Sequence, residues 1–507
     1  MNRILKLLSI VIIVMSSSCS KDYLNTKPTG STTTTTVFES VENIALAING
    51  INKLMTIQYL QSQGFNGEGT IKMWYGNYPG NHFFVNLPGW SSIINGEYRE
   101  VTTSIYLYYP WYYYYRIIGN ANSIIVNTDA AKGAQTDKDF VKAQALTFRA
   151  YAYFMLSQLY CNRWKDSNNG ASDGVVLRLD ESTGDMPLST LGEVYTQVYK
   201  DLDDAIALYT SSGKSRQFNY DPDKSVAYAI YARAAITRED YPKAAAMAAN
   251  AKAGYSLMSN SDYRSGFNAP NSEWIWGSFG STDENLHFYS FHAYIGYNSN
   301  ASNVRLYPKC ISKELFDKIP ATDIRKGLFL DPTGYSYTTA TGVAGSALKA
   351  RAFQLYPDIF SSSTAYAYMQ FKFKSIDFPG VGNINHFRSS EMLLIEAEAK
   401  YYQNDIPGAQ AAMNALNRDS GRDPEYSCTK TGTALLEEIK MYRALELWGE
   451  GFDWFDLKRW GDNLSRKSPA DGGSFISVLA VERDPSYGNN WTWRIPLRET
   501  DYNNMLN

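Results

Sequence analysis

The stretch ARAAITREDYPKAAA at residues 232–246 recurs as AEAKYYQNDIPGAQA at residues 397–411. The two copies share six residues at identical spacing, namely Ala-x-Ala, then Asp-x-Pro, then Ala-x-Ala. Asp accepts hydrogen bonds from the free amides of a helix start, and Pro in the first turn needs no amide hydrogen of its own. Alanines on both sides allow two helices to approach closely. Each copy therefore predicts a helical hairpin of the tetratricopeptide (TPR) kind, which buries its core by stacking on its neighbours.

Helical periodicity extends outward from these hairpins over much of the chain. In the segment 137–160, apolar residues recur at alternating steps of four and three from Val141 to Leu159. The segment 189–209 does the same, with Ser189 or Thr190 placed as its N-cap. We therefore expect a mostly α fold, a TPR-like helical repeat scaffold that contains further, degenerate copies of the hairpin. Similar patterns occupy about 38–60, 111–127, 224–238, 242–255, 388–403, 406–419 and 433–449.

Two regions interrupt the helical pattern. Residues 61–103 and 256–387 are rich in Gly, Ser, Asn and aromatic residues, with short β-prone runs at 274–276 and 369–373. Loops held on a rigid scaffold commonly carry binding sites. The expected body thus has three parts: an N-terminal helical part with TPR-like units at 37–255 that contains the insertion 61–103, a loop-rich ligand-binding region at 256–387, and C-terminal TPR-like helices at 388–507.

The first 18 residues have the layout of a secretory signal peptide. Two basic residues precede an apolar run from Leu7 to Met15, which three serines follow. This run is far shorter than the roughly 20 residues that span a bilayer. Cys19 comes next, as at a bacterial lipoprotein cleavage site, where the cysteine is acylated and becomes the new N-terminus. Ser16 stands where leucine is usual in that pattern, so ordinary cleavage with a spare thiol at Cys19 is the alternative.

Residues 19–36 would then link the lipid to the folded body. This segment is rich in Ser, Thr, Gly and Pro and includes five consecutive threonines at 32–36. Such a composition predicts a flexible tether. The lipidated Cys19 would anchor the mature protein to a membrane.

Composition excludes several functional classes. The chain has 507 residues, with 48 Lys and Arg against 51 Asp and Glu, so it lacks the excess of positive charge that is typical of nucleic-acid-binding proteins. Only 4 His and 4 Cys are present, which argues against a disulfide scaffold and a His-rich metal site. In contrast, 39 Tyr and 11 Trp favour a binding surface over acid–base chemistry.

Catalytic and cofactor motifs are absent from the sequence. It contains no P-loop, no HExxH and no CxxC pair, so we expect neither a cofactor nor a metal, and we expect a protein that is not an enzyme. A glycoside hydrolase needs only two carboxylates placed in space, and the sequence alone leaves that possibility open.

Aromatic residues in the two irregular regions are the candidate ligand contacts. The run YLYYPWYYYY at 106–115 enters a helix, where its rings can pack in the core. Rings among Gly, Asn and Pro lack an obvious core face, and an aromatic face suits the apolar C–H face of a pyranose. The competing interpretation is that these rings fill gaps between the loops and the scaffold. The predicted ligand-binding residues are Trp74, Tyr75, Trp90, Tyr289, Tyr294 and Tyr297.

Several motifs resemble those of the SusD/RagB family, and the resemblance runs from Cys19 to the C-terminus. The most specific is ELWGEGFDWFDLKRW at 446–460, in which Asp453 stands where many relatives have a basic residue, so no role is carried over to that side chain. The others are SKDYLNTKP at 20–28, WYYYYRIIGNAN at 111–122, AQALTFRAYAY at 143–153, RSSEMLLIEAEA at 388–399 with Asn417, and IPLRETDYN at 495–503.

The resemblance implies a surface glycan- or nutrient-binding lipoprotein of the Bacteroidetes. It implies four TPR-like units that support an irregular ligand-binding region. It also implies a partner, a SusC-like TonB-dependent transporter in the outer membrane, to which captured oligosaccharide or polysaccharide is delivered. Alternatives are a peptide-binding or other nutrient-binding member of the family, a structural adaptor of the transporter, or a surface glycoside hydrolase.

Overall fold

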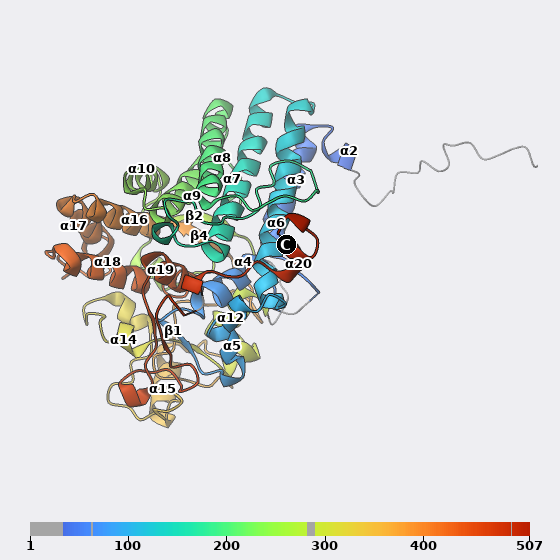
Figure 1. Ribbon diagram of the computed structural model, residues 1–507. Coiled ribbons are helices and arrows are strands. Elements are labelled where there is room, and N and C mark those ends of the chain that lie inside the picture. Colours follow the sequence, from blue (N-terminus) through green and yellow to red (C-terminus); the bar gives the residue numbers. More distant parts are fainter. Residues whose placement is uncertain (1–33, 62–63, 281–288, 488, 507) are drawn as a thin grey trace, which may run out of the picture.

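The computed structural model describes residues 34–61, 64–280, 289–487 and 489–506 (Figure 1). The predicted signal peptide at 1–18, Cys19 and most of the tether lie outside the described residues. Helices dominate the fold, and the long ones gather on one side of the molecule, while short elements and loops fill the other side (Figure 1). In the part that the structure describes, no helix combines the length and the apolar character that crossing a membrane requires.

The longest helices form the N-terminal part of the scaffold. Helices α6 (Ile105–Asn127), α7 (Gln135–Tyr160) and α8 (Leu191–Ser212) pack in sequence order, and α3 (Val41–Leu54) packs against α6 and α7. Helix α8 starts at a capping box in which Thr190 and Glu193 satisfy each other's amides, and it ends at Gly213 with a φ of 61°. The predicted N-cap is therefore confirmed as Thr190.

The repeated sequence folds as two helical hairpins with the same kind of turn and cap. The first comprises α9 (Lys224–Thr237) and α10 (Tyr241–Ala251), and the second α16 (Ser389–Tyr402) and α17 (Ile406–Asn414). The turn residue before each cap has a left-handed backbone, with φ of 62° at Glu239 and 63° at Asn404. Asp240 accepts from the Lys243 amide at 3.3 Å, and Asp405 from the Gly408 amide at 3.0 Å. The predicted caps are confirmed.

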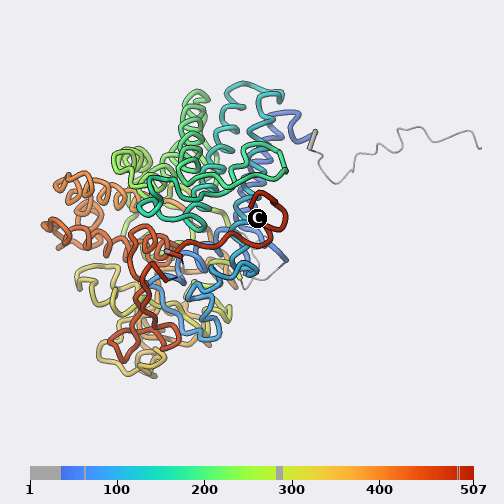
Figure 2. Tube along the Cα trace, viewed as in Figure 1, coloured from blue at the N-terminus to red at the C-terminus, as the bar shows by residue number. Residues whose placement is uncertain are grey.

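The two hairpins stack on each other as a helical repeat should. Helix α10 packs against α16, so the green hairpin lies beside the orange one in Figure 2 although their sequences are far apart. Across this junction the rings of Tyr241 and Tyr402 are stacked, with centroids 4.4 Å apart. Helix α18 (Gly432–Glu446) packs on α16 and extends the layer. The TPR-like scaffold expected from the repeat is thus present.

Short antiparallel strand pairs join the loop-rich regions to each other and to the scaffold. Strand β1 (Phe83–Val85) pairs with β3 (Lys309–Ile311), which connects the insertion 61–103 to the region 256–387. Strand β2 (Trp274–Ser278) pairs with β4 (Ile384–Arg388), directly ahead of α16, and β5 (Leu464–Ser465) pairs with β6 (Glu482–Arg483). The other short elements are α2 (Thr34–Val37), α4 (Gly67–Thr70), η2 (Ile71–Asn77), η3 (Pro88–Trp90), α5 (Ser91–Ile94), η4 (Glu97–Glu100), η5 (Thr128–Ala130), η6 (Trp164–Asp166), α11 (Asn260–Tyr263), α12 (Phe291–Ile295), α13 (Ser302–Arg305), α14 (Lys313–Phe316), η8 (Ile324–Leu328), α15 (Ser346–Leu355), η9 (Ala415–Asp419), α19 (Asp453–Trp460), η10 (Pro469–Asp471), η11 (Asn489–Trp491), α20 (Leu497–Thr500) and η12 (Asn504–Leu506).

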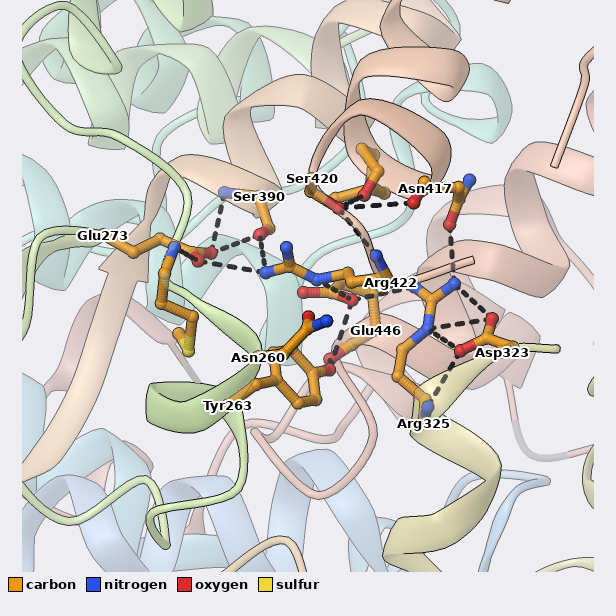
Figure 3. A network of polar contacts seen from close by, with 12 residues as sticks. Asn260, Tyr263, Glu273, Asp323, Arg325, Ser390, Asn417, Ser420, Arg422 and Glu446 are labelled. Carbon is orange, nitrogen blue, oxygen red and sulfur yellow. Dashed lines mark hydrogen bonds and ion pairs between the residues drawn. The ribbon is translucent and has the colours of Figure 1, made fainter. Parts of the chain in front are cut away.

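A buried ion cluster holds the loop-rich region to the helices (Figure 3). Arg388 donates to Glu446 at 2.7 Å and to Glu273 at 2.7 Å, and Arg325 and Arg422 also pair with Glu446, at 2.8 and 3.2 Å. All five side chains are at most 1% exposed. Burial opposes ionisation of Glu446, but the guanidinium groups of Arg422, Arg388 and Arg325 outweigh it and hold the pKa of Glu446 well below its usual range. Glu446 is therefore an ionised carboxylate held among three arginines.

The cap in the second hairpin gives a direct test of the repeat. Replacing Asp405 with Ala leaves the Gly408 amide without its acceptor, so the free energy of unfolding should fall by about 1 kcal/mol. Asp405→Asn is the matched control because Asn also caps helices well, and it should retain most of that free energy. Denaturant unfolding of the three chains measures the difference. Equal denaturation midpoints for the wild type and Asp405→Ala would show that the cap does not contribute to the stability of the protein.

Candidate functional site

Four of the six predicted ligand-binding rings meet in one aromatic cluster. The ring centroids of Trp90 and Trp74 are 5.5 Å apart, those of Trp74 and Tyr294 are 6.0 Å apart, and those of Tyr294 and Tyr289 are 6.3 Å apart. Tyr106, at the start of α6, joins them with its ring 5.7 Å from that of Trp74. Together with Phe65, 5.4 Å from Trp74, these residues form what we call the Trp74 cluster.

Trp74 is the buried centre of this cluster and not an exposed ligand contact. Its side chain is 1% exposed, because it lies in the π-helix η2, all of whose residues are buried. Gly64 has a φ of 96°, and a Cβ there would lie 2.4 Å from the Trp74 ring, so the glycine allows the backbone to cover the indole. The expectation of an exposed loop at this position was wrong, since the Gly-rich segment lets the chain pack tightly around the ring.

Three further predicted rings are also buried, which corrects the expectation of an exposed arc. Tyr75 is fully buried and donates from its hydroxyl to the carbonyl oxygen of Tyr106 at 2.7 Å. Tyr294 is 3% exposed and packs edge-on against Trp74. Tyr297 lies in a separate group of rings, where it donates to the carboxylate of Asp358 at 3.0 Å. Burial raises the pKa of all three phenols, so each stays neutral.

Trp90, Tyr106 and Tyr289 keep part of their surface in solvent, and we call these three residues the aromatic rim. Trp90 ends the short 3₁₀ helix η3 and packs edge-on against Trp74 at 75°. Tyr289 lies next to residues 281–288, which fall outside the described part of the chain. The hydroxyls of Tyr106 and Tyr289 have no hydrogen-bond partner among the described residues. The rim thus offers three partly exposed aromatic rings on a buried aromatic support.

Tyr106 belongs to this site although the sequence assigned its whole run to the core. Most of the run is indeed core, because Tyr109, Trp111, Tyr113 and Tyr114 are buried along α6. Tyr106 lies in the first turn of α6, just after the N-cap Ser104, where the helix emerges from the core. The signal that identifies it is this position at the helix start, together with the serine that caps it.

His292 and the cysteines of the described chain are buried groups with shifted pKa values. Within the described ranges, no group of three or more His, Cys, Asp or Glu side chains could hold a metal ion. Burial lowers the pKa of His292 to about 4, so this histidine is neutral at physiological pH. Cys161, Cys310 and Cys428 are free and buried, and burial raises the pKa of the Cys161 thiol to about 12. These groups therefore supply neither a nucleophile nor a general acid near the rim.

Residues of the sequence motifs form ion pairs and hydrogen bonds that hold the scaffold together. Arg149 forms a two-pronged ion pair with Asp201, at 2.8 and 2.6 Å. Arg459 does the same with Glu398, at 2.5 and 2.7 Å. At the C-terminus, Glu499 accepts from the indole of Trp111 at 3.0 Å and fastens the last segment to α6. The motifs thus mark the scaffold, while the rim lies outside them.

Comparison with known proteins agrees with this fold. Residues 22–236 match the family model described as "Starch-binding associating with outer membrane", and residues 357–503 match the model of the SusD family. The SusD-like protein P2 of Formosa agariphila is 24% identical over 435 residues, which cover 76% of each chain.

Solved structures match over almost the whole length. A SusD-like carbohydrate-binding protein from Bacteroides vulgatus has a TM-score of 0.74 at 22% identity, and the match covers 92% of this chain and 97% of that one. A SusD superfamily protein from Bacteroides thetaiotaomicron has a TM-score of 0.71 at 21% identity, covering 92% and 99%. With family models matched at both ends and a shared fold between them, the chain belongs to the SusD/RagB family.

Proposed function

We propose that this protein binds glycans at the cell surface without chemically altering them and passes them to a SusC-like TonB-dependent transporter in the outer membrane. The observation that carries the proposal is the aromatic rim, three partly exposed rings on a rigid aromatic base in a protein of this family. Family membership supports the ligand class, since one matching model is described as starch-binding and a structural relative as carbohydrate-binding. The predicted lipid at Cys19 supplies the anchor.

The chemistry of the rim suits capture followed by release. An aromatic side chain buries about 150–250 Å² when it is fully covered. Covering half of one ring at about 25 cal/mol/Å² contributes roughly 2 kcal/mol before ordering costs. Two or three such contacts with a few hydrogen bonds give only a modest affinity. A carrier that hands its ligand to a transporter needs this kind of reversible binding.

A panel of oligosaccharides tests the proposal as a whole. The pure protein should bind at least one of maltoheptaose, cellohexaose, xylohexaose and mannohexaose in calorimetry, and the sugar should be recovered at its original length. Matched peptides of similar size serve as the comparison. Cleavage of the sugar would identify a hydrolase, and binding of peptides alone would identify a peptide carrier; either result contradicts the proposal.

Trp90 is partly exposed and Trp74 is buried, so substitutions at these two positions test ligand binding and protein stability separately. Trp90→Ala should weaken saccharide binding by roughly 1–2 kcal/mol and leave the melting temperature nearly unchanged, because its ring is partly exposed. Trp74→Ala is the internal control and should reduce stability by about 3–5 kcal/mol, since the ring is buried. Paired melting and binding measurements check both values. If a stably folded Trp90→Ala chain bound saccharide as tightly as the wild type, the aromatic rim would not be the binding site.

The lipid anchor is tested at Cys19. Cys19→Ala removes the thiol that would be acylated, so the exported protein should be recovered in the soluble periplasmic fraction. Cys19→Ser is a second variant that keeps the size of the side chain and should behave in the same way. Fractionation and surface labelling of cells provide the measurement. Continued display of either variant at the surface would show that Cys19 is not the anchor.

A further inference from the structure

We infer that the chain has a second saccharide-binding site, a cavity of about 560 Å³ between residues 337–342 and residues 468–477. The inference rests on the proposed class of ligand but uses none of the residues of the aromatic rim. The volume lies within the range of about 300–1,000 Å³ that is typical of ligand pockets. The two walls come from segments far apart in sequence, which lie at the bottom of the view in Figure 1, one before α15 and the other containing η10.

Three aromatic residues form one side of this cavity. Tyr337 is partly exposed, and its ring lies 6.4 Å from that of Tyr368 at an angle of 80°. Phe84, on strand β1, is 1% exposed and forms part of the base. Tyr337 is held by a bridge to Ala344, so its ring projects from a fixed backbone. The cavity thus presents an accessible ring backed by two buried rings, as the Trp74 cluster does.

The backbone of Tyr368 has an unusual conformation for an aromatic residue. Its φ is 65°, in the left-handed region that non-glycine residues rarely adopt. Two backbone hydrogen bonds hold it there, from its amide to the carbonyl of Leu330 at 2.9 Å and from the Ile311 amide to its own carbonyl at 3.1 Å. Strain that is maintained by surrounding structure is characteristic of functional sites, and here it directs a ring to the cavity wall.

Small residues keep the cavity open. Gly342 has a φ of 81°, and a Cβ there would lie 3.6 Å from the Phe84 ring and 3.3 Å from that of Tyr366. A side chain at this position would be strained and would cover the aromatic base, so glycine leaves the ring surface accessible. The other small lining residues are Ala340, Ala367, Ala470, Gly472 and Gly473.

The polar groups of the cavity suit a neutral sugar. Thr339 and Ser477 are exposed at its edge, and their hydroxyls have no partner among the residues that the structure describes. Among the described residues, Lys313 is the single charged residue that lines the cavity, and its ammonium group is already paired with Asp317. A phosphorylated or sulfated ligand would find no free cation here. Hydroxyls beside aromatic faces match the mixed C–H and hydroxyl surface of a neutral oligosaccharide.

Two modest sites on one chain favour long glycans. When a polysaccharide occupies the rim, a second site on the same molecule binds at a high effective concentration, which raises the overall affinity without new contacts. We therefore expect the cavity to contribute more to polysaccharide binding than to the binding of a short oligosaccharide.

Hydroxyl-radical footprinting of the full mature chain tests the two sites separately in one experiment. The probes are the four neutral oligosaccharides of the panel at millimolar concentration, and oxidation is quantified at Trp90, Tyr337 and Tyr335. At least one probe should reduce oxidation of Tyr337 severalfold, in the wild type and in Trp90→Ala alike. Tyr335 is the matched control, because it is exposed in the same segment but does not line the cavity.

Filling the cavity gives the second arm of the test. Ser477→Trp replaces an exposed hydroxyl at the edge with a large side chain, so it should abolish protection of Tyr337 and leave protection of Trp90 unchanged. If Trp90 is protected while Tyr337 is oxidised equally with every probe, the second site is refuted and the proposed function stands. If Tyr337 alone is protected, the second site stands and the rim is refuted. If neither residue is protected by any probe, both are refuted.

Discussion

Three buried arginines that share Glu446 hold the two halves of this protein together. Arg325 comes from the loop-rich region, Arg388 from the junction of β4 and α16, and Arg422 from the segment that follows η9. Glu273, ahead of β2, pairs with Arg388 and Arg422, and Glu450 adds a further ion pair to Arg388. Removing one partner from such a buried group typically costs about 3–5 kcal/mol, because the remaining charge is left unpaired in the interior. The loop-rich region therefore has a fixed position on the helices, which a ligand site built from its loops requires.

Much of the scaffold follows from local sequence rules. Helical periodicity, the Asp-x-Pro caps and the alanine-rich faces predict the two hairpins, and the four hairpin helices begin within one residue of the predicted starts. The contacts that assemble the loop-rich region are not local. Trp274 pairs with Arg388 across the β2–β4 sheet, and Gly76 lies so close to Gly451 that a Cβ would meet its carbonyl oxygen at 2.2 Å. Periodicity within a window of the sequence carries no information about such distant partners, so these contacts could not be predicted.

The sequence predicted several of the aromatic residues that gather at the candidate site, but it did not predict which of them are exposed. Aromatic residues in Gly-rich segments do gather, because Trp74, Trp90, Tyr289 and Tyr294 form one cluster. Their exposure depends on what covers them, and glycine permits close packing as readily as it permits an open loop. Trp74 is thus buried where an open loop was expected, and Tyr106 reaches the rim because the start of α6 emerges from the core.

The structure combines a rigid helical frame, an ion cluster that positions the loops, and aromatic rings that emerge at the surface from a buried base. This arrangement suits reversible capture of a glycan by a preformed surface. The most direct measurement is a crystal structure of the chain with a bound oligosaccharide. We expect a sugar ring parallel to the indole of Trp90, with carbon–carbon contacts at about 3.5–4.0 Å, and a scaffold that has not moved. A fully occupied sugar that touches neither Trp90 nor Tyr289 would contradict it.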